Sequence, residues 1–321
     1  MEKQSFKLLL NYFRSSAQKS KVTGFTLIEL LVAMVMAGVM ISVLLYIVVE
    51  LLKIDLREAN SNETQAEMQL ALEYITSDLR EAVYVYDDPS KIKAYIPDFG
   101  TPKPVIAFWR PNLVDEDDLK KLGDCSTSFT TDEAKIVECE TLLLRRNTYS
   151  LVVYLQSKND SSSIWKGQSR IMRYELPKYK DITKLELSLG YVDPSRKDTS
   201  FENWPKDGSG KSLQGSDPEK NKPYPPVLID FVDDPGNKDS KVPSCDTSKK
   251  YARVPATTIT ELNNSFFTCV RPEEPGFNQD IFVFLRGNAF GKQGVFTDKE
   301  FLPTLQTQVI VRGVIDKIPS Q

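Results

Sequence analysis

The absence of histidine limits the chemistry that this 321-residue sequence could perform. A Ser-His-Asp triad, a Cys-His pair and imidazole metal ligands are all excluded. Carboxylates, lysines and cysteines remain, but the sequence contains no GxSxG nucleophile motif and no phosphate-binding loop. These residues do not form a catalytic constellation, so the sequence predicts a protein that is not an enzyme.

Four cysteines form the next set of reactive side chains: Cys125, Cys139, Cys245 and Cys269. They allow three pairings, and proximity along the chain favours Cys125 with Cys139 and Cys245 with Cys269. A zinc site is the alternative, but CxxC spacing is absent and there is no histidine ligand. We therefore expect two local disulfides in an oxidising compartment and no bound metal.

Acidic clusters offer a weaker candidate for a ligand site. Asp115–Asp118 (DEDD) is the densest cluster of carboxylates, which calcium prefers as ligands. A solvated helix start is the alternative reading, and it is favoured because no EF-hand pattern is present. Asp230, Asp233 and Asp234 form a similar but weaker group, so calcium is a minor possibility and no cofactor is expected.

The three tryptophans could form a sugar-stacking surface. Trp109 lies in an apolar stretch that is typical of a core, whereas Trp165 and Trp204 lie in polar surroundings and are expected to be exposed. Single aromatic residues are more often packing residues, so the sugar site is the minority hypothesis. The net charge of −3 does not favour a nucleic-acid partner, which usually requires a basic face.

Glu29 is the most unusual carboxylate because it lies within the apolar run Phe25–Val49. As a helix this run would be about 37 Å long, enough to cross a bilayer core of about 30 Å, and it is too long for a secretory signal. Five basic residues precede the run, which places the N-terminus in the cytoplasm and everything after Val49 outside it. A charge in such a helix is costly, so Glu29 is expected to be functional.

The stretch Lys21–Met34 (KVTGFTLIELLVAM) resembles the class III signal of type IV pilins and type II secretion pseudopilins. The resemblance implies that prepilin peptidase cleaves between Gly24 and Phe25, and that Phe25 is then N-methylated. Glu29 would become the fifth residue of the mature chain, and its carboxylate would pair with the Phe25 ammonium of a neighbouring subunit. The implied partners are other pilins or pseudopilins, the peptidase and an inner-membrane assembly platform.

One long helix from about Phe25 to about Tyr84 is predicted to carry these residues. No proline occurs before Pro89, and an apolar stripe begins at Met68 and continues with spacings of four, three, four and three. The stripe consists of Met68, Leu72, Ile75, Leu79 and Ala82. Its expected role is to pack on a globular head, with a coiled-coil seam as the alternative. The sequence is thereby divided into a leader (1–24), an assembly helix (25–49), an amphipathic stalk (50–86) and a head (87–321).

Runs of β-branched and aromatic residues after the stalk predict a mainly antiparallel β head, and hence an α+β fold like that of pilins. The predicted strands are Val105–Arg110, Thr141–Asn147, Ser150–Gln156, Arg170–Leu176, Val227–Val232, Ile281–Leu285 and Gln306–Arg312. A hairpin is expected at Leu144–Leu151. Residues 193–226 and 233–250 are polar and rich in proline or charge, so both predict long irregular surface loops.

Short patches of the stalk and head add a narrower resemblance. Ala71–Ala82 is similar to the helix end of J/W-type minor pilins. Other patches, such as PVIAFWRP and FLRGNAFG, look like the cyanobacterial pseudopilins of hormogonium polysaccharide secretion. The resemblance implies a minor subunit of a membrane-anchored fibre that supports polysaccharide export and surface motility. An adhesive or carbohydrate-binding pilin, with secreted polysaccharide as a partner, and a membrane-anchored periplasmic enzyme are the competing hypotheses.

Overall fold

The computed structural model describes residues 24–160, 162–215, 225–238, 242–256, 263–272, 278–295 and 302–312. The chain forms two compact units, Met1–Asp55 and Leu56–Gln321. Nearly all of the predicted leader, with its five basic residues, lies outside the described residues.

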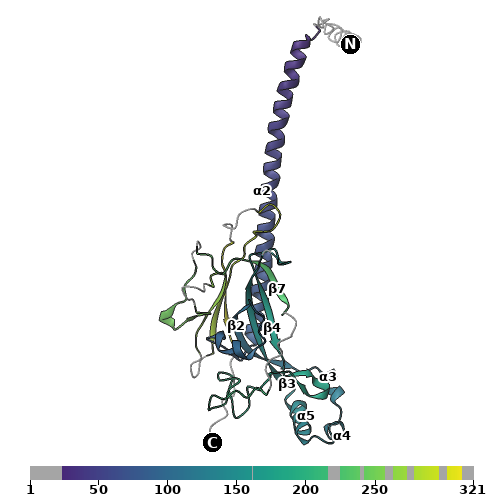
Figure 1. The fold of residues 1–321 in the computed structure, drawn as a ribbon, viewed down its shortest axis with the longest axis vertical. Coiled ribbons are helices and arrows are strands. Elements are labelled where there is room, and N and C mark those ends of the chain that lie inside the picture. Colours follow the sequence, from purple (N-terminus) through teal and green to yellow (C-terminus); the bar gives the residue numbers. More distant parts are fainter. Residues whose placement is uncertain are drawn as a thin grey trace, which may run out of the picture. The chain divides into compact units, whose positions relative to one another are not determined.

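One helix, α2 (Leu27–Glu81), runs through both units (Figure 1). It ends where Ala82 and Val83 lead into strand β1 (Tyr84–Val85), so the helix predicted over residues 25–84 is confirmed. In the second unit every residue of the Met68–Ala82 stripe is at most 7 % exposed. The stripe therefore packs on the head and does not form an exposed seam.

The larger sheet of the head has five antiparallel strands in the order β1-β2-β3-β4-β7. Its remaining strands are β2 (Lys103–Leu113), β3 (Asn147–Lys158), β4 (Ser169–Leu176) and β7 (Val227–Val232). A second antiparallel sheet has the order β11-β10-β9-β8. Its strands are β8 (Ala252–Val254), β9 (Phe266–Val270), β10 (Asp280–Leu285) and β11 (Leu305–Ile310).

Both faces of the five-stranded sheet are covered, because successive side chains of a strand point to opposite faces. Phe108 and Tyr154 pack with the α2 stripe and with the inner face of the second sheet. Trp109 and Val153, their neighbours in sequence, pack on the other face against the 310 segment η1 (Pro89–Tyr95) and residues 191–213. The central strands are consequently buried along most of their length.

A separate lobe with its own small core is inserted at one end of the larger sheet, and Figure 1 shows its three helices grouped beside the start of β3. It contains α3 (Glu116–Leu122), α4 (Cys125–Ser128), α5 (Glu133–Arg145), β5 (Tyr179–Asp181), η2 (Ile182–Lys184) and β6 (Glu186–Leu187). One further 310 turn, η3 (Thr247–Lys249), precedes β8.

The predicted strand Thr141–Asn147 is wrong, because residues 141–145 are the last turns of α5. Asp132 caps this helix by accepting a hydrogen bond from the Lys135 amide, and Cys139 and Leu142 are buried at helical spacing. The predicted hairpin at 144–151 is also wrong. Arg146, at φ 54°, ends α5 in the left-handed conformation and turns the chain into β3.

The irregular region 193–226 is only partly the exposed loop that its composition suggests. It contains no named strand or helix among residues 193–215, as expected, but Phe201 and Leu213 pack against the outer core of the sheet and Trp204 is buried in it. Residues 216–224 of this loop lie outside the described part of the chain. In the second loop, Asp233 is fully buried.

Candidate functional site

The N-terminal end of α2 carries the residues expected to be processed. Gly24 and Phe25 precede the helix, and Phe25 is 78 % exposed. Thr26 starts the helix, since its Oγ1 accepts a hydrogen bond from the Glu29 amide at 3.3 Å and its carbonyl accepts from the amides of Glu29 and Leu30. Thr26 and Glu29 have the spacing of a capping box, which fixes the first turn beside an accessible Gly24–Phe25 bond.

Beyond this cap, the side chains of Leu27–Asp55 are all exposed within the structure. Most are large and apolar: Leu31, Leu45 and Val49, for example, are each about half exposed or more. Among the described residues, α2 is the one helix that is long and apolar enough to cross a membrane. A helix that is apolar all round is stable only in an apolar environment, so its length and composition suit a single-pass membrane anchor.

At the other end of α2, Asp78 joins the helix to the sheet and is 7 % exposed. Its carboxylate accepts hydrogen bonds from Arg110 and Arg173, each at 2.8 Å, and from the Tyr154 hydroxyl at 2.7 Å. Arg173 also pairs with Glu175 at 2.6 Å. This cluster fixes the helix on β2, β3 and β4, and none of its members was singled out from the sequence, because they come from four separate segments.

The pKa of Glu175 is lowered from 4.5. Burial alone would raise it, but the hydrogen bond and positive charge of Arg173, the amide of Asn112 and the charge of Arg110 together outweigh burial. Burial would likewise lower the pKa of Arg173, yet its bonds to Asp78 and Glu175 raise it. The cluster is therefore held together by ionised groups.

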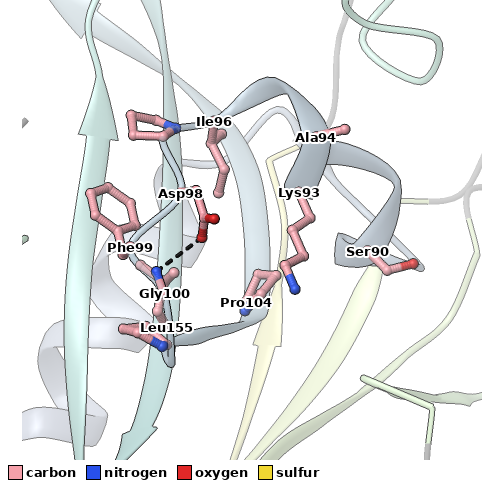
Figure 2. A pocket seen from close by; sticks show the side chains of 11 residues that line it. Ser90, Lys93, Ala94, Ile96, Asp98, Phe99, Gly100, Pro104 and Leu155 are labelled. Carbon is pink, nitrogen blue, oxygen red and sulfur yellow. Dashed lines mark hydrogen bonds between the residues drawn. The ribbon is translucent and has the colours of Figure 1, made fainter. Parts of the chain in front are cut away.

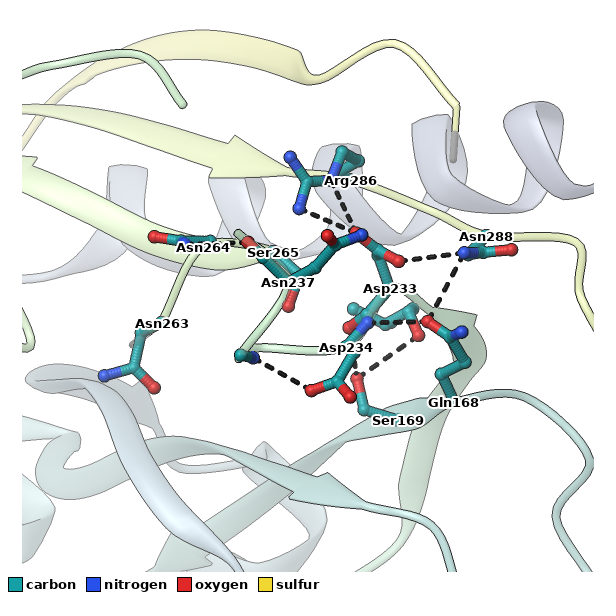
Figure 3. Close-up of polar contacts among 12 residues, drawn as sticks. Gln168, Ser169, Asp233, Asp234, Asn237, Asn263, Asn264, Ser265, Arg286 and Asn288 are labelled. Carbon is teal, nitrogen blue, oxygen red and sulfur yellow. Dashed lines mark hydrogen bonds and ion pairs between the residues drawn. The ribbon is translucent and has the colours of Figure 1, made fainter. Parts of the chain in front are cut away.

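The weaker acidic group does not converge on a metal site (Figure 3). Asp233 is paired with Arg286 at 2.6 Å and accepts a hydrogen bond from Asn288 at 2.9 Å. Asp234 faces Lys158 at 2.5 Å. Asp230 accepts hydrogen bonds from the Asn159 side chain and from the backbone of residues 166 and 167. These carboxylates are structural partners within the head.

The helix start predicted at Asp115–Asp118 is confirmed. Asp115 caps α3 by accepting from the Asp117 amide, and Asp118 pairs with Lys121 at 2.7 Å. Among the described residues, no group of three or more His, Cys, Asp or Glu side chains could hold a metal ion.

The cysteines are paired as proximity along the chain favoured. Cys125 is bonded to Cys139 and ties α4 to α5, and Cys245 is bonded to Cys269 of β9. No described cysteine is free.

The core position predicted for Trp109 is confirmed, whereas the exposure expected for Trp204 is wrong. Trp109 is fully buried and Trp204 is 3 % exposed, with their ring centroids 5.3 Å apart. The Trp204 indole donates to the Val192 carbonyl at 2.9 Å, which satisfies its polar group inside the core. Only Trp165 is partly exposed.

A cavity of about 660 Å³ lies between η1 and the start of β2 (Figure 2). Buried apolar residues such as Ile96, Phe99 and Leu155 form its floor. Its acidic residue, Asp98, is engaged in a turn through the Gly100 amide at 2.9 Å. The lining contains one cation, Lys93, and no pair of groups suited to acid–base or nucleophilic catalysis.

Comparison with known proteins identifies the N-terminal segment. Residues 19–45 match the model of the prokaryotic N-terminal methylation motif. No curated protein and no solved structure matches the chain. The matched residues include Gly24, Phe25 and Glu29 and extend into the apolar half of α2. The chain therefore combines the methylation motif of type IV pilin-like proteins with an α+β, pilin-like architecture, a long N-terminal apolar helix followed by antiparallel sheets.

Proposed function

We propose that the protein is a non-enzymatic minor pseudopilin, a structural subunit of a type IV pilus-like or type II secretion-like fibre. The observation that carries the proposal is the methylation motif over residues 19–45, placed on a helix whose first half exposes apolar side chains on every face. Such a surface suits a membrane before assembly and the packed helices of a fibre afterwards.

The processing step follows from the same segment. Prepilin peptidase removes residues 1–24 at the Gly24–Phe25 bond, and the new Phe25 amine is methylated. A glycine before the bond allows close approach of the peptidase, because it has no Cβ atom. Intact-mass analysis of the membrane-extracted protein is expected to find methylated Phe25 at the N-terminus. A mature chain that starts at Met1 contradicts the proposal.

Glu29 directs assembly in this proposal. In a fibre its carboxylate is surrounded by apolar side chains, where an unpaired charge is costly, and the Phe25 ammonium of the adjacent subunit offsets that cost. Removing one partner of a buried ion pair typically costs about 3–5 kcal/mol, which is enough to prevent incorporation.

We expect Glu29→Ala to abolish fibre incorporation and Glu29→Gln to fail to restore it, with cleavage nearly unchanged. Glu50→Ala is the matched control, because Glu50 lies on the same helix in an exposed pair with Lys53 at 3.6 Å. Surface pairs of this kind contribute little. Fibre incorporation is measured by fractionating sheared fibres at matched protein amounts. Incorporation of Glu29→Ala at the wild-type level contradicts the role of Glu29 in assembly.

We further propose that the fibre containing this subunit supports polysaccharide secretion and surface motility. The support is the resemblance of short patches of the sequence to J/W-type minor pilins and to pseudopilins of polysaccharide export. The N-terminus is then cytoplasmic, and the head (87–321) is periplasmic or on the fibre surface. Gene deletion with assays of secreted polysaccharide and piliation tests this role. The alternative, a carbohydrate-binding pilin, has less support because Trp204, which was expected to be exposed, is buried and Trp165 is only partly exposed.

A further inference from the structure

Strand β11 (Leu305–Ile310) lies at one edge of the four-stranded sheet. Its six residues pair antiparallel with β10, and the pairing has no register shift. On its other side, no strand pairs with β11 among the residues that the structure describes. The edge of a sheet presents a row of backbone N–H and C=O groups, which can act as a template for a further strand.

One hydrogen bond shows which backbone groups of β11 face outwards. The Val311 amide donates to the Gln279 carbonyl at 2.9 Å, and this pair continues the register of β10 and β11. Backbone groups alternate in direction along an antiparallel strand, so Val311 and every second residue before it face β10. The residues between them direct their N–H and C=O groups away from β10. These residues are Gln306, Gln308 and Ile310, and all three are exposed.

The side chains of β11 alternate between a core face and an exposed face. Leu305 packs against the core between the sheets and Val309 is 2 % exposed, whereas Ile310 is 63 % exposed. An added strand with apolar residues at every second position would therefore extend the core on one face. No charged residue and no proline occurs in Leu305–Ile310, so neither opposes the approach of such a strand.

The other edges of the two larger sheets are capped, short or irregular. β1 has two residues, and the Gln279 side chain bonds to both the N–H and the C=O of Val85, at 2.8 and 2.9 Å. β8 has three residues and is followed directly by Pro255. The pairing of β7 with β4 contains two register shifts. Such features protect edge strands from pairing, and Leu305–Ile310 has none of them.

We propose that β11 is a docking edge for an extended segment of a partner protein, which adds a fifth strand to the sheet by pairing with Gln306, Gln308 and Ile310. The segment carries apolar residues at every second position and no proline at the positions that donate to β11. The proposal does not depend on the fibre role, because β11 is remote in sequence from Glu29 and the apolar helix. Loss of fibre incorporation and loss of strand binding are therefore separate results.

The test selects peptides from a phage-displayed library of random dodecapeptides on the full-length protein in detergent. Enriched peptides are expected to carry apolar residues at alternate positions. One synthesised peptide is then used in hydrogen-exchange measurements on the wild type. It is expected to slow the amides of Gln306, Gln308 and Ile310, and to leave those of Thr307 and Val309, which already face β10, unchanged.

A pair of variants at one position separates the backbone from the side chain. Gln306→Pro removes an outward N–H and spares the β10 ladder, because an edge strand accommodates proline where its nitrogen faces away from the sheet. Gln306→Thr retains the N–H. The proline variant is expected to bind the synthesised peptide about fivefold more weakly than the threonine variant, which corresponds to the loss of one hydrogen bond.

Three results would overturn the proposal: no enriched peptide, protection that does not follow the alternation along β11, or equal binding by the two variants. Dimerisation of the wild type that Gln306→Pro abolishes would also contradict it, because the edge would then belong to a second copy of the chain. Thermal unfolding detects a folding defect in either variant. The exchange pattern of the wild type remains decisive in that case.

Discussion

The two halves of α2 differ in burial although they belong to one uninterrupted helix. No side chain of Leu27–Asp55 is buried, whereas eight are buried between Thr64 and Leu79. The first half is apolar on every face, and the second has a single apolar stripe with a polar face opposite. The pattern of apolar residues, and not helix propensity, therefore decides whether each half requires an apolar surrounding on all sides or one packed face.

Removing the polar contact of the second half should have the largest effect on the head. Asp78→Ala leaves Arg110 and Arg173 without their shared carboxylate, and breaking such a buried pair costs about 3–5 kcal/mol. Denaturant unfolding of the full-length protein in detergent measures the change. Glu73→Ala, an exposed acid on the same helix, is the control, and a loss equal to that control would contradict the role of Asp78.

Residues on opposite faces of the second half should differ in their effect on stability. Ile75 is fully buried, so Ile75→Ala is expected to lower the free energy of unfolding by about 2–5 kcal/mol. Leu70 is 67 % exposed, and Leu70→Ala should change it by less than about 0.5 kcal/mol. The same unfolding assay compares them, and similar losses for both variants would mean that the helix does not pack by its stripe.

Lowering the pH should reduce the stability of the head through protonation of Glu175. This effect should be smaller than those of Asp78→Ala and Ile75→Ala. Its folded pKa lies below 4.5, so its contribution to stability is complete above pH 4.5 and is lost as pH falls through the lower folded value. Unfolding measured from neutral pH to about 3 should show this loss. Glu175→Gln should be less stable at neutral pH and less sensitive to acid, and an unchanged slope would contradict the linkage.

The sequence predicted those parts of the fold that depend on local pattern. The strand Val227–Val232 has the predicted bounds, and the stripe from Met68 to Ala82 is buried. The strand expected at Thr141–Asn147 failed because three consecutive leucines suit a strand as well as a helix. The cap at Asp132, with Cys139 and Leu142 at a helical spacing, was the signal that could have distinguished them.

Long-range partners explain what the sequence could not predict. Trp204 has polar neighbours in sequence, but it is buried by Trp109 and Tyr95, which lie far away along the chain. Lys178, Glu138 and Asp193 likewise come from three separate segments, so no spacing rule identifies the ion-pair bridge that they form. The N-terminal motif was recognisable from sequence because it is contiguous.

Both disulfides link residues that are close in sequence, separated by 14 and 24 positions, and the first loop closes before the second begins. In a chain that is synthesised from its N-terminus, Cys139 therefore follows Cys125 while Cys245 and Cys269 have not yet been made. The first pair can form before either cysteine of the second pair exists, and once bonded it no longer competes for Cys245 or Cys269. The order of the cysteines thus favours the two local pairings over the crossed ones.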